Sequence, residues 1–541
     1  MFLNTSLNQN FLSSVTYRLL SRANGVSMSS VELYPALAPY LLIGFAFLLP
    51  LLRLLRVGRT VSRVVALGAM VFTTLLSITI YLSTRGGRVL VYTIGGFPIP
   101  LGIAYAVDEF SSLLGLLTSL LFPLLAPVSH LFVDDNEYYY SALLGLEAGL
   151  LGVFYTGDVF NMFVMLEVFT ISAFVLISTA KTRGAFKATI TYAIAGMVAG
   201  TFFFLSAVLV YYSAGSLNIG NVAAIVSGLY PPMGRSVDVR VALLMPLLIM
   251  TWSMLVESAI SPLHFWLPGA YSNAPPVVSS ILSGLAEGMA FYVVARLYYT
   301  VYAGIPDYIQ LMLGLLGGLT VGVAGAGLIA SKSLMRVISY TVILDSGMMV
   351  LALSLGPSGI PVFLSYAIAH ALVKPVLFLS SGYTRVEGAS SSSSPLSVLW
   401  SSRALAFSFL IGVLNVVGIP PTALFMAKLQ LYMLALDSFS RGNPVALITL
   451  IALPIGSILA LIGFVKQLSE IFSARKPARV AGPPGYLKAL VTALAIASLA
   501  IGLAYNPVQG VINASATAVL DRLAYIHSVL EKTLVPVVVY G

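Results

Sequence analysis

Apolar runs, each of about the length that crosses a bilayer, follow one another along almost the whole chain. A membrane-spanning helix needs about 20 consecutive apolar residues. Because the runs are long and do not alternate between polar and apolar positions, a transmembrane β-barrel is excluded. We therefore predict an all-α polytopic membrane protein with about fourteen transmembrane helices. The predicted helices cover residues 34–55, 62–83, 110–133, 139–157, 158–179, 188–212, 240–265, 275–303, 306–330, 334–355, 358–384, 403–435, 444–470 and 485–505.

The composition agrees with a membrane protein rather than a soluble one. Of 541 residues, 59% are hydrophobic and only 9% are charged, whereas about a quarter of an average soluble domain is charged. The net charge of +9 does not indicate nucleic acid as a partner, because the basic residues lie in short loops between apolar runs, as in membrane proteins generally. No cleavable secretory signal stands out, since Arg18 and Arg22 do not lead into a short apolar core.

Redox chemistry within this chain is not expected. The sequence contains no cysteine, which excludes disulfides, thiolate zinc sites and cysteine-ligated iron–sulfur clusters here. The sequence also offers no nucleotide-binding βαβ pattern. We expect no cofactor and no metal centre in this chain, so any electron transfer would belong to other subunits.

The loops differ strongly in positive charge, which predicts their side of the membrane. The basic residues after odd-numbered helices are Arg53, Arg56, Arg59, Arg63, Lys181, Arg183, Lys187, Lys332, Arg336, Arg385, Arg403, Lys466, Arg475, Lys476, Arg479 and Lys488. Those after even-numbered helices are Arg85, Arg88, Arg235, Arg240, Arg296 and Arg441. This bias of sixteen against six predicts odd-numbered loops in the cytoplasm and both termini outside. The loop at 134–137 is an acidic exception, but acidic residues weigh little in this rule.

Four further segments have patterns of their own. Residues 88–106 are rich in β-branched and aromatic residues around a Gly-Gly pair, which predicts a short extracytoplasmic β-hairpin. Residues 217–229 have the pattern of a short surface helix, and the serines at 390–394 predict a flexible loop. The tail at 506–541 is moderately amphipathic, and we expect it on the membrane face or on a neighbouring surface.

Ionisable residues inside the apolar runs are the strongest indication of function. Each is costly in lipid unless it is paired or hydrated. His370 and Lys374 lie four residues apart and therefore share one helix face. Any single member could be a structural ion-pair partner, but the spread of the set over many helices favours a hydrated polar path through the membrane. The set is Glu147, Asp158, Glu167, Glu257, His264, Glu287, Asp345, His370, Lys374 and Lys428.

Two of the predicted helices contain helix-breaking residues beside a buried charge. The breaks follow Glu257 in the seventh helix and precede Lys428 in the twelfth. Backbone groups freed at membrane depth persist only where they line a cavity, and paired breaks in two halves are typical of inverted-repeat transporters. Ordinary kinks are the alternative. The breaking residues are Pro262 and Pro268 in the seventh helix and Gly418, Pro420 and Pro421 in the twelfth.

Five motifs make the chain similar to a known family. They are TGDVFNMFVMLEVFTISAFVL (156–176), AISPLHFWLPGAYSNAPPVVSSILSG (259–284), KSLMRVISYTVILDSG (332–347), HALVKPVLFLSSG (370–382) and GIPPTALFMAKL (418–429). Together they resemble the antiporter-like membrane subunits shared by respiratory complex I, Mrp-type Na+/H+ antiporters and membrane-bound energy-converting hydrogenases. The first motif resembles the Mrp and hydrogenase branch most.

The resemblance implies fourteen helices with two inverted five-helix repeats and both termini outside. The chain would then divide into five parts. These are an N-terminal extracytoplasmic segment (1–33), helices one to three with the hairpin (34–133), the first repeat of helices four to eight (139–303), the second repeat of helices nine to thirteen (306–470), and helix fourteen with the amphipathic tail (485–541).

The resemblance also implies roles for individual residues. Glu167 matches the glutamate of the family's fifth helix. His370 and Lys374 match the His/Lys pair of the eleventh helix, which lies on the central axis. Lys428 matches the charged residue of the twelfth helix, on the exit side of the proton path. Asp345 takes a tenth-helix polar position that is often His or Gln in relatives.

Two lysines of the family pattern are missing. Glu257 stands in place of the seventh-helix lysine, and Gly288, preceded by Glu287, stands in place of the eighth-helix lysine. Glu167 would then face another carboxyl group, and two buried acids cannot easily both ionise. Three alternatives remain: Na+ held near Glu167 and Glu257 by oxygen ligands, a proton relay through carboxyl groups, or a first half that no longer pumps.

The leading hypothesis is an ion-translocating subunit of a multisubunit complex, which moves H+, with Na+ as an open alternative, along the file of buried charges. It would couple redox chemistry or cation exchange to proton transport. Its expected partners are other membrane subunits of a complex I-like, Mrp-like or hydrogenase-like assembly, and the lipid bilayer of the cell membrane. The alternatives are a non-conducting structural or coupling subunit of the same kind of complex, and a stand-alone carrier for a small organic solute.

Overall fold

Every predicted span contains a helix among the residues that the structure describes. The helices of the first half are α2 (Ser30–Leu54), α3 (Arg59–Thr84), α4 (Glu109–Leu125), α5 (Glu137–Tyr155), α6 (Val159–Ser178), α7 (Arg183–Ala214), α9 (Val239–Glu257), α10 (Leu267–Asn273) and α11 (Pro276–Ala295), which continues as the π-helical turn η4 (Arg296–Tyr302). Those of the second half are α12 (Asp307–Ala330), α13 (Leu334–Ser354), α14 (Gly359–Gly388), α15 (Arg403–Val417), α16 (Ala423–Ser440), α17 (Pro444–Ser473) and α18 (Gly485–Leu503).

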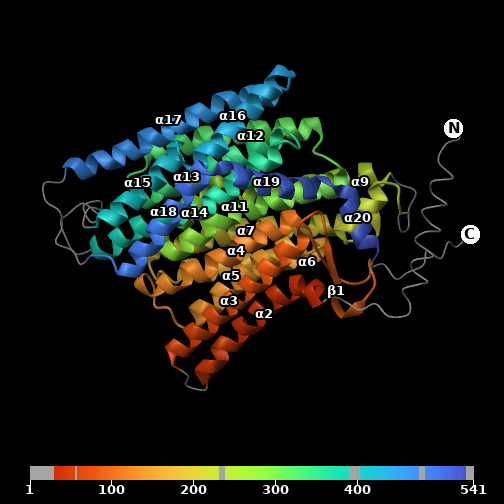
Figure 1. The fold of residues 1–541 in the computed structure, drawn as a ribbon, viewed down its shortest axis with the longest axis horizontal. Helices are drawn as coiled ribbons and strands as arrows, with labels where there is room; N and C mark the ends of the chain where they lie inside the picture. The colour runs from red at the N-terminus through yellow and green to blue at the C-terminus, as the bar shows by residue number, and fades with distance from the viewer. Residues whose placement is uncertain are drawn as a thin grey trace, which may run out of the picture.

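The computed structural model describes residues 30–54, 58–230, 238–388, 399, 402–473 and 482–531. These residues form an elongated body of helices lying side by side, with α2 and α3 along one edge and α16 and α17 along the opposite edge (Figure 1). Within the described residues, twelve helices are long and apolar enough to cross a membrane. The chain is therefore a multi-pass membrane protein. The predicted loop at 390–394 and most of segment 1–33 lie outside the described residues.

The count of fourteen spans stays a prediction. The twelve helices that meet the length and hydropathy requirement do not include α5 or the pair α15 and α16. Helix α5 is 19 residues long but carries four tyrosines and two glutamates, and the twelfth predicted span is divided by its break into two shorter helices. The inverted relation of the two predicted repeats likewise stays a prediction.

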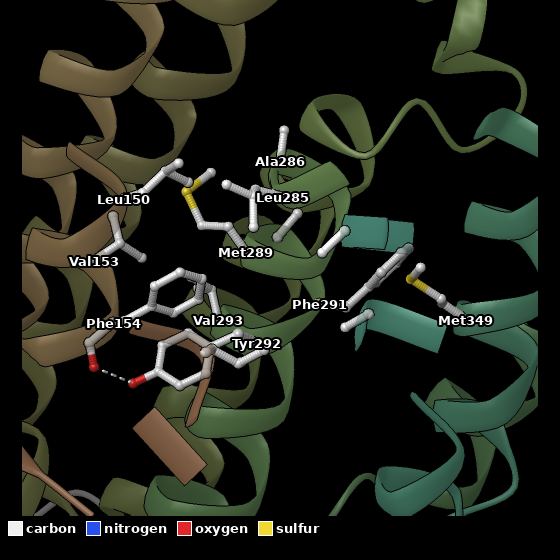
Figure 2. Packing of buried hydrophobic residues seen from close by; sticks show 14 of the residues in the cluster. Leu150, Val153, Phe154, Leu285, Ala286, Met289, Phe291, Tyr292, Val293 and Met349 are labelled. Atoms are coloured by element: carbon white, nitrogen blue, oxygen red, sulfur yellow. Dashed lines mark hydrogen bonds between the residues drawn. The ribbon is translucent and has the colours of Figure 1, made fainter. Parts of the chain in front are cut away.

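Three helices form the centre of the body. All of α11 is buried, as is η4 up to Val301. Nearly all of the most apolar parts of α13 and α14 is buried as well, whereas less than half of the corresponding parts of α7 and α17 is buried. Helices that are apolar on all sides are expected in such a position. Figure 2 shows Leu285 and Met289 of α11 facing Leu150 on α5, while Phe291 points the other way, toward Met349 of α13. The ionisable residues on these central helices are therefore shielded from lipid by protein.

The predicted hairpin is present. Strand β1 (Leu90–Thr93) pairs antiparallel with β2 (Ala104–Val107) in the register Leu90 to Val107. The turn contains the Gly-Gly pair, whose residues Gly95 and Gly96 both have positive φ angles, which glycine adopts without steric cost. Directly after β2, the Asp108 carboxylate accepts a hydrogen bond from Ser111 N at the start of α4, so the hairpin also sets where α4 begins.

The predicted surface helix is wrong in one respect. Helix α8 (Ile219–Val226) is present, but its residues 219–225 are buried. The C-terminal helices α19 (Tyr505–Leu520) and α20 (Arg522–Leu530) return over the chain, and Val529 of α20 packs at Gly220. Arg522 donates hydrogen bonds to Ala223 O of α8 and to Thr300 O and Val301 O of η4. The described part of the tail therefore covers α8 and lies on the chain itself.

The treatment of Arg296 as a loop residue is also wrong. Arg296 lies in η4 and is buried, with Nη1 and Nη2 2.7 and 2.6 Å from the two carboxylate oxygens of Asp108. Its charge is therefore neutralised within the protein and says nothing about membrane side. The acidic loop at 134–137 has a comparable explanation, because Arg59 pairs with Asp134 at 2.8 Å and Arg63 pairs with Asp135 at 2.7 Å.

Candidate functional site

The second helix break holds Lys428. Helix α15 ends at Val417, and Gly418 follows with φ of +87°, a left-handed conformation that favours glycine. Lys428 Nζ donates to Val416 O at 2.6 Å, to Val417 O at 3.4 Å and to Ser457 Oγ at 3.0 Å. The last carbonyls of a helix carry partial negative charge and have no partner within the helix. The break therefore supplies the oxygen atoms that hold the buried amine.

Gly418 is needed at the break for a second reason. A Cβ atom at this position would lie 2.8 Å from Lys428 Cδ. The Asn415 side chain spans the break, because its Oδ1 accepts from Leu424 N of α16 while its Nδ2 donates to Ser498 Oγ of α18. The break is thus a built feature with satisfied backbone groups, and not an ordinary kink.

The first helix break has a different chemistry. Helix α9 ends at Glu257, and the chain continues through a short 3-10 turn, η3 (Leu263–Trp266), into α10. Trp266 Nε1 donates to Val256 O at 3.0 Å, which is the role that Lys428 has at the second break. The break lies at Pro262, whereas Pro268 lies within the first turn of α10, where proline is tolerated.

Glu257 has a phenol as its partner. Tyr192 of α7 donates to Glu257 Oε1 at 2.5 Å, and its ring stacks on Trp266 with centroids 4.0 Å apart. Glu257 is the last residue of α9, where the helix dipole disfavours negative charge. A lysine at this position would meet the dipole favourably, so the departure from the family pattern changes the electrostatics of the first break.

Glu167 lies beside Glu257 in the same pocket. It is half-buried on α6 and lines a small pocket between α6, α7 and α9 together with Glu257, Thr170 and Ser253. Gly200 of α7 also lines this pocket, and a side chain there would collide with the Glu167 carboxylate. The two carboxyl groups therefore line one small, mostly apolar pocket, as the missing lysine led us to expect.

A three-residue cluster occupies the centre of the second half. Asp345 of α13 lies 2.7 Å from Lys374 Nζ and 3.0 Å from His370 Nε2, both through Oδ2. Lys374 also donates to Thr341 Oγ1 at 3.0 Å. All four side chains are buried. The single acid therefore bridges the two titratable groups that share a face of α14.

Glu287 connects the two halves. It is buried on α11, and its Oε1 accepts from Tyr271 of α10 at 3.0 Å. It interacts electrostatically with Glu257 on one side and with Lys374 on the other. Glu257 interacts in turn with Glu167, and Lys428 with Lys374 and Asp345. The groups therefore form a series in the order Glu167, Glu257, Glu287, then Lys374 with Asp345 and His370, and finally Lys428. Among the described residues, direct ion-pair contact within this series is confined to Lys374, Asp345 and His370, and the other groups interact over longer distances.

Several buried oxygen atoms along this series lack a partner within the described residues. They are Oε2 of Glu287, Oδ1 of Asp345 and the hydroxyl of Tyr366. Buried polar atoms without a protein partner are commonly satisfied by ordered water. Glu287, Asp345 and Tyr366 therefore each keep an oxygen that could bind water. We call the series from Glu167 to Lys428 the charged axis.

Three predicted residues lie apart from the charged axis. Asp158 caps α6, because its side chain accepts a hydrogen bond from Asn161 N at 2.9 Å. His264 is half-buried in η3 and lies 3.1 Å from Ser261 Oγ. Glu147 of α5 meets Thr73 of α3. These three residues lie in apolar stretches of the sequence, as the residues of the charged axis do, so the sequence could not separate the two groups.

Sequence reasoning missed the polar partners of the axis. Tyr192, Tyr271, Thr341 and Ser457 occupy ordinary positions in apolar helices, and no local pattern marks them. Asn415 could have been found, because it is an amide within the apolar run immediately before the Gly-Ile-Pro-Pro break.

The comparison with protein families decides the relationship. The family described as NADH:quinone oxidoreductase/Mrp antiporter, TM, matches residues 156–454, more than half of the chain. The chain belongs to this family. The matched region contains both helix breaks and every residue of the charged axis. The similarity noted from the five motifs is therefore confirmed.

Two curated relatives match almost the whole chain. A Na(+)/H(+) antiporter subunit of Alkalihalophilus pseudofirmus is 26% identical over 515 residues, which cover 93% of this chain and 100% of the relative. The corresponding Na(+)/H(+) antiporter subunit of Bacillus subtilis is 26% identical over 520 residues, with the same two coverages.

Solved structures of family assemblies have the same fold. A chain of the Mrp complex from Dietzia sp. matches with a TM-score of 0.81 and 21% identity, over 93% of this chain and 100% of that chain. A chain of the membrane-bound sulfane sulfur reductase, an archaeal respiratory membrane complex, gives 0.79 and 23%, over 92% and 99%. A chain of respiratory complex I from Thermus thermophilus gives 0.67 and 22%, over 87% and 98%. At these identities the likeness concerns the fold alone.

Proposed function

We propose that this chain is the ion-translocating membrane subunit of a multisubunit complex and that it moves protons along the charged axis. The observation that carries the proposal is the connected series of buried titratable groups between Glu167 and Lys428. Buried ionisable groups within a membrane are costly and mark ion pathways by default. A non-conducting subunit would have no physical need for such a series.

The second half supplies the proton-carrying amines. Lys374 can give a proton to Asp345, to which it is already hydrogen-bonded at 2.7 Å, and His370 shares the same carboxylate oxygen. Lys428 interacts electrostatically with this cluster, so protonation of one amine disfavours protonation of the other. When the Lys428 amine is neutral, the carbonyls of Val416 and Val417 lose a charged donor, which couples its charge to the helix break.

The first half works without a lysine in this proposal. Glu167, Glu257 and Glu287 have no basic side chain within ion-pair distance in the part of the chain that the structure describes. We propose a relay of carboxyl groups assisted by the phenols of Tyr192 and Tyr271, which donate to Glu257 and Glu287. A phenol hydroxyl of this kind can donate its proton on one side and accept another, and rotation about its C–O bond then returns it to the starting orientation.

A sodium site is the second candidate for the first half. It is favoured by the small pocket that Glu167 and Glu257 share with the hydroxyl-bearing residues Thr170 and Ser253, because Na+ is a hard cation that prefers oxygen ligands. The curated relatives are subunits of Na+/H+ antiporters. If Na+ binds there, replacing it by K+ should lower ion flux in a Glu257-dependent manner.

We further propose a cell-membrane location with both termini outside, as the loop charges predict. The proposed partners are other membrane subunits of an Mrp-like, complex I-like or hydrogenase-like assembly. The names of the similar proteins support this, since they are subunits of Na+/H+ antiporters and chains of respiratory membrane complexes. Redox centres, where the complex has them, would lie in those partners. A stand-alone solute carrier is not favoured, because the relatives are subunits.

The test is ion flux in proteoliposomes that contain the whole complex. Lys428→Ala should abolish proton movement, while Lys187→Ala, an exposed lysine at the start of α7, should leave it unchanged. Equal flux in the Lys428 variant and the unaltered complex would refute the proposed role of the axis and favour a structural subunit.

A further inference from the structure

Glu147 is a buried acid that the charged axis does not use. It lies near the middle of α5 and is fully buried. Its Oε2 has no hydrogen-bond partner among the described residues, and no basic side chain there lies within ion-pair distance of it. Taking an unpaired carboxylate out of water is very costly. The site therefore favours the neutral acid, which carries a proton.

The hydroxyl beside Glu147 is compatible with the same form. Thr73 Oγ1 of α3 lies 3.1 Å from Glu147 Oε1, 2.9 Å from Met70 O and 3.1 Å from Ala69 O. The hydroxyl has one hydrogen, which it can donate to Glu147 or to a backbone carbonyl. In the second arrangement the carboxyl group is the donor to Thr73 and is protonated.

A row of buried hydroxyls on α3 begins at Thr73. Ser77 and Thr84 follow at intervals of four and seven residues, which places all three within about 40° around the helix. Each reaches a neighbouring helix. The Tyr155 hydroxyl of α5 donates to Ser77 Oγ at 3.0 Å, and Thr84 Oγ1 lies 2.7 Å from Ser112 Oγ of α4.

Helix α4 closes the gap between these two contacts. Gly115 lies directly against the Tyr155 hydroxyl, where any side chain would collide with it. Ser112 is three residues before Gly115, about 4.5 Å along the same helix. The Tyr155 hydroxyl and Ser112 are thus separated by about one turn of α4, and Thr73 and Ser77 by about one turn of α3, so a bridging water is needed at both steps. We call the five hydroxyls of Thr73, Ser77, Tyr155, Ser112 and Thr84 the hydroxyl lane.

The hydroxyl lane has one open end. Thr84 is the last residue of α3 and precedes the exposed turn 85–88, which leads into the β-hairpin. In the opposite direction, Glu147 is followed by Leu143 and Leu144 on α5 and by Ala66 on α3, all buried and apolar. Exchange with water is thus possible on the hairpin side and blocked on the other.

We propose that Glu147 is a second proton-binding site, outside the charged axis, which exchanges its proton with water on the β-hairpin face through the hydroxyl lane. In each transfer the O–H bond of the donor breaks, and its proton adds to a lone pair of the next oxygen, which releases its own proton onward. The electron pair stays on each donor oxygen. The carboxylate left at Glu147 is neutralised again when a proton returns along the same lane.

The test is infrared spectroscopy of the purified complex during transfer from H2O to D2O. The complex should show the carbonyl band of a protonated, buried carboxylic acid, and Glu147→Gln should remove it. Tyr155→Phe should slow the deuterium shift of that band by about tenfold, the change that a loss of about 1.4 kcal/mol in the transfer path produces. Ser77→Ala, a smaller change in the same contact, should slow it as well.

Thr118→Ala is the matched control. Thr118 is a buried hydroxyl on α4 that bonds Leu114 O of its own helix and takes no part in the lane. This variant should leave the band and its exchange rate unchanged. The inference is overturned if Glu147→Gln leaves the band intact, or if Tyr155→Phe and Ser77→Ala exchange as fast as the unaltered complex. Because the infrared measurement does not depend on ion flux, it tests the inference about Glu147 independently of the role of Lys428.

Discussion

The cluster of Asp345, Lys374 and His370 allows a sharp test of how the buried charges are balanced. Asp345 is the one acid within ion-pair distance of Lys374 in the described residues, and both side chains are fully buried. Asp345→Asn removes the negative charge and leaves the ammonium group without a counter-charge. Removing one partner of a buried pair costs about 3–5 kcal/mol. We therefore expect a loss of this size in the free energy of unfolding.

Adding Lys374→Met to Asp345→Asn should restore much of the lost free energy of unfolding. Lys374→Met alone should cost less than Asp345→Asn, because His370 remains 3.0 Å from Asp345 and can compensate its charge. In the double variant both the carboxylate and the ammonium group are absent, so no buried charge is left without a partner, and the methionine side chain fills the space of the lysine. Removing both members of a buried pair costs less than removing one, because no uncompensated charge is left behind. The double variant should therefore be more stable than Asp345→Asn alone, by about 2 kcal/mol or more.

The assay is equilibrium unfolding of the purified complex in mixed micelles with increasing SDS, followed by circular dichroism. The control combines Lys374→Met with Asp108→Asn, which disrupts the separate buried pair with Arg296, and here no rescue is expected. If the effects of Asp345→Asn and Lys374→Met add within about 0.5 kcal/mol, the two side chains do not interact and the electrostatic reasoning is refuted.

Three further predictions concern the two helix breaks and the buried ion pair of Asp108 and Arg296. Gly418→Ala and Gly442→Ala both place a side chain at positive φ and should each cost about 1–2 kcal/mol of stability. Only Gly418→Ala should abolish proton flux, because its new Cβ displaces Lys428. Gly442→Ala is the control, since nothing lies within 4 Å of a Cβ atom at that position. Equal flux in the two variants would contradict the role assigned to the break. Glu257→Lys restores the family residue and should change the pH dependence of proton flux in proteoliposomes, whereas an unaltered profile would favour an inactive first half. Asp108→Asn should lower the free energy of SDS unfolding by about 3–5 kcal/mol. It should leave proton flux per assembled complex unchanged, because the pair of Asp108 and Arg296 lies outside the charged axis. A loss of flux would show that the axis extends further.

Much of the architecture could be predicted because it depends on local chemistry. A run of apolar residues must avoid water wherever it lies, so the helices of the fourteen ranges follow from the sequence, as does the hairpin around its Gly-Gly turn. The helix breaks coincide with Pro262 and with the Gly-Ile-Pro-Pro stretch, where proline removes a backbone N–H donor. Proline alone does not decide a break, because Pro246 lies inside α9 and Pro375 lies inside α14.

The partners of the buried charges could not be predicted, because they depend on how helices distant in sequence are rotated against one another. Glu147 and Glu257 look alike in the sequence, yet one meets Thr73 of α3 and the other meets Tyr192 of α7. Asp158 has a similar apolar setting but caps a helix.

The sequence by itself determined that the chain crosses the membrane many times, where two of its helices break and that the ionisable residues within the apolar runs must be sheltered from lipid, although it did not identify the buried pair of Arg296 and Asp108. These follow from the free energy of each residue in hydrocarbon, which does not depend on its neighbours. Only the tertiary structure decided that Asp345 joins Lys374 and His370, that carbonyls of α15 hold Lys428, and that Glu147 stands apart beside a row of hydroxyls. Hydrogen bonds and ion pairs act over a few ångströms, and those distances are set by the packing of the whole bundle.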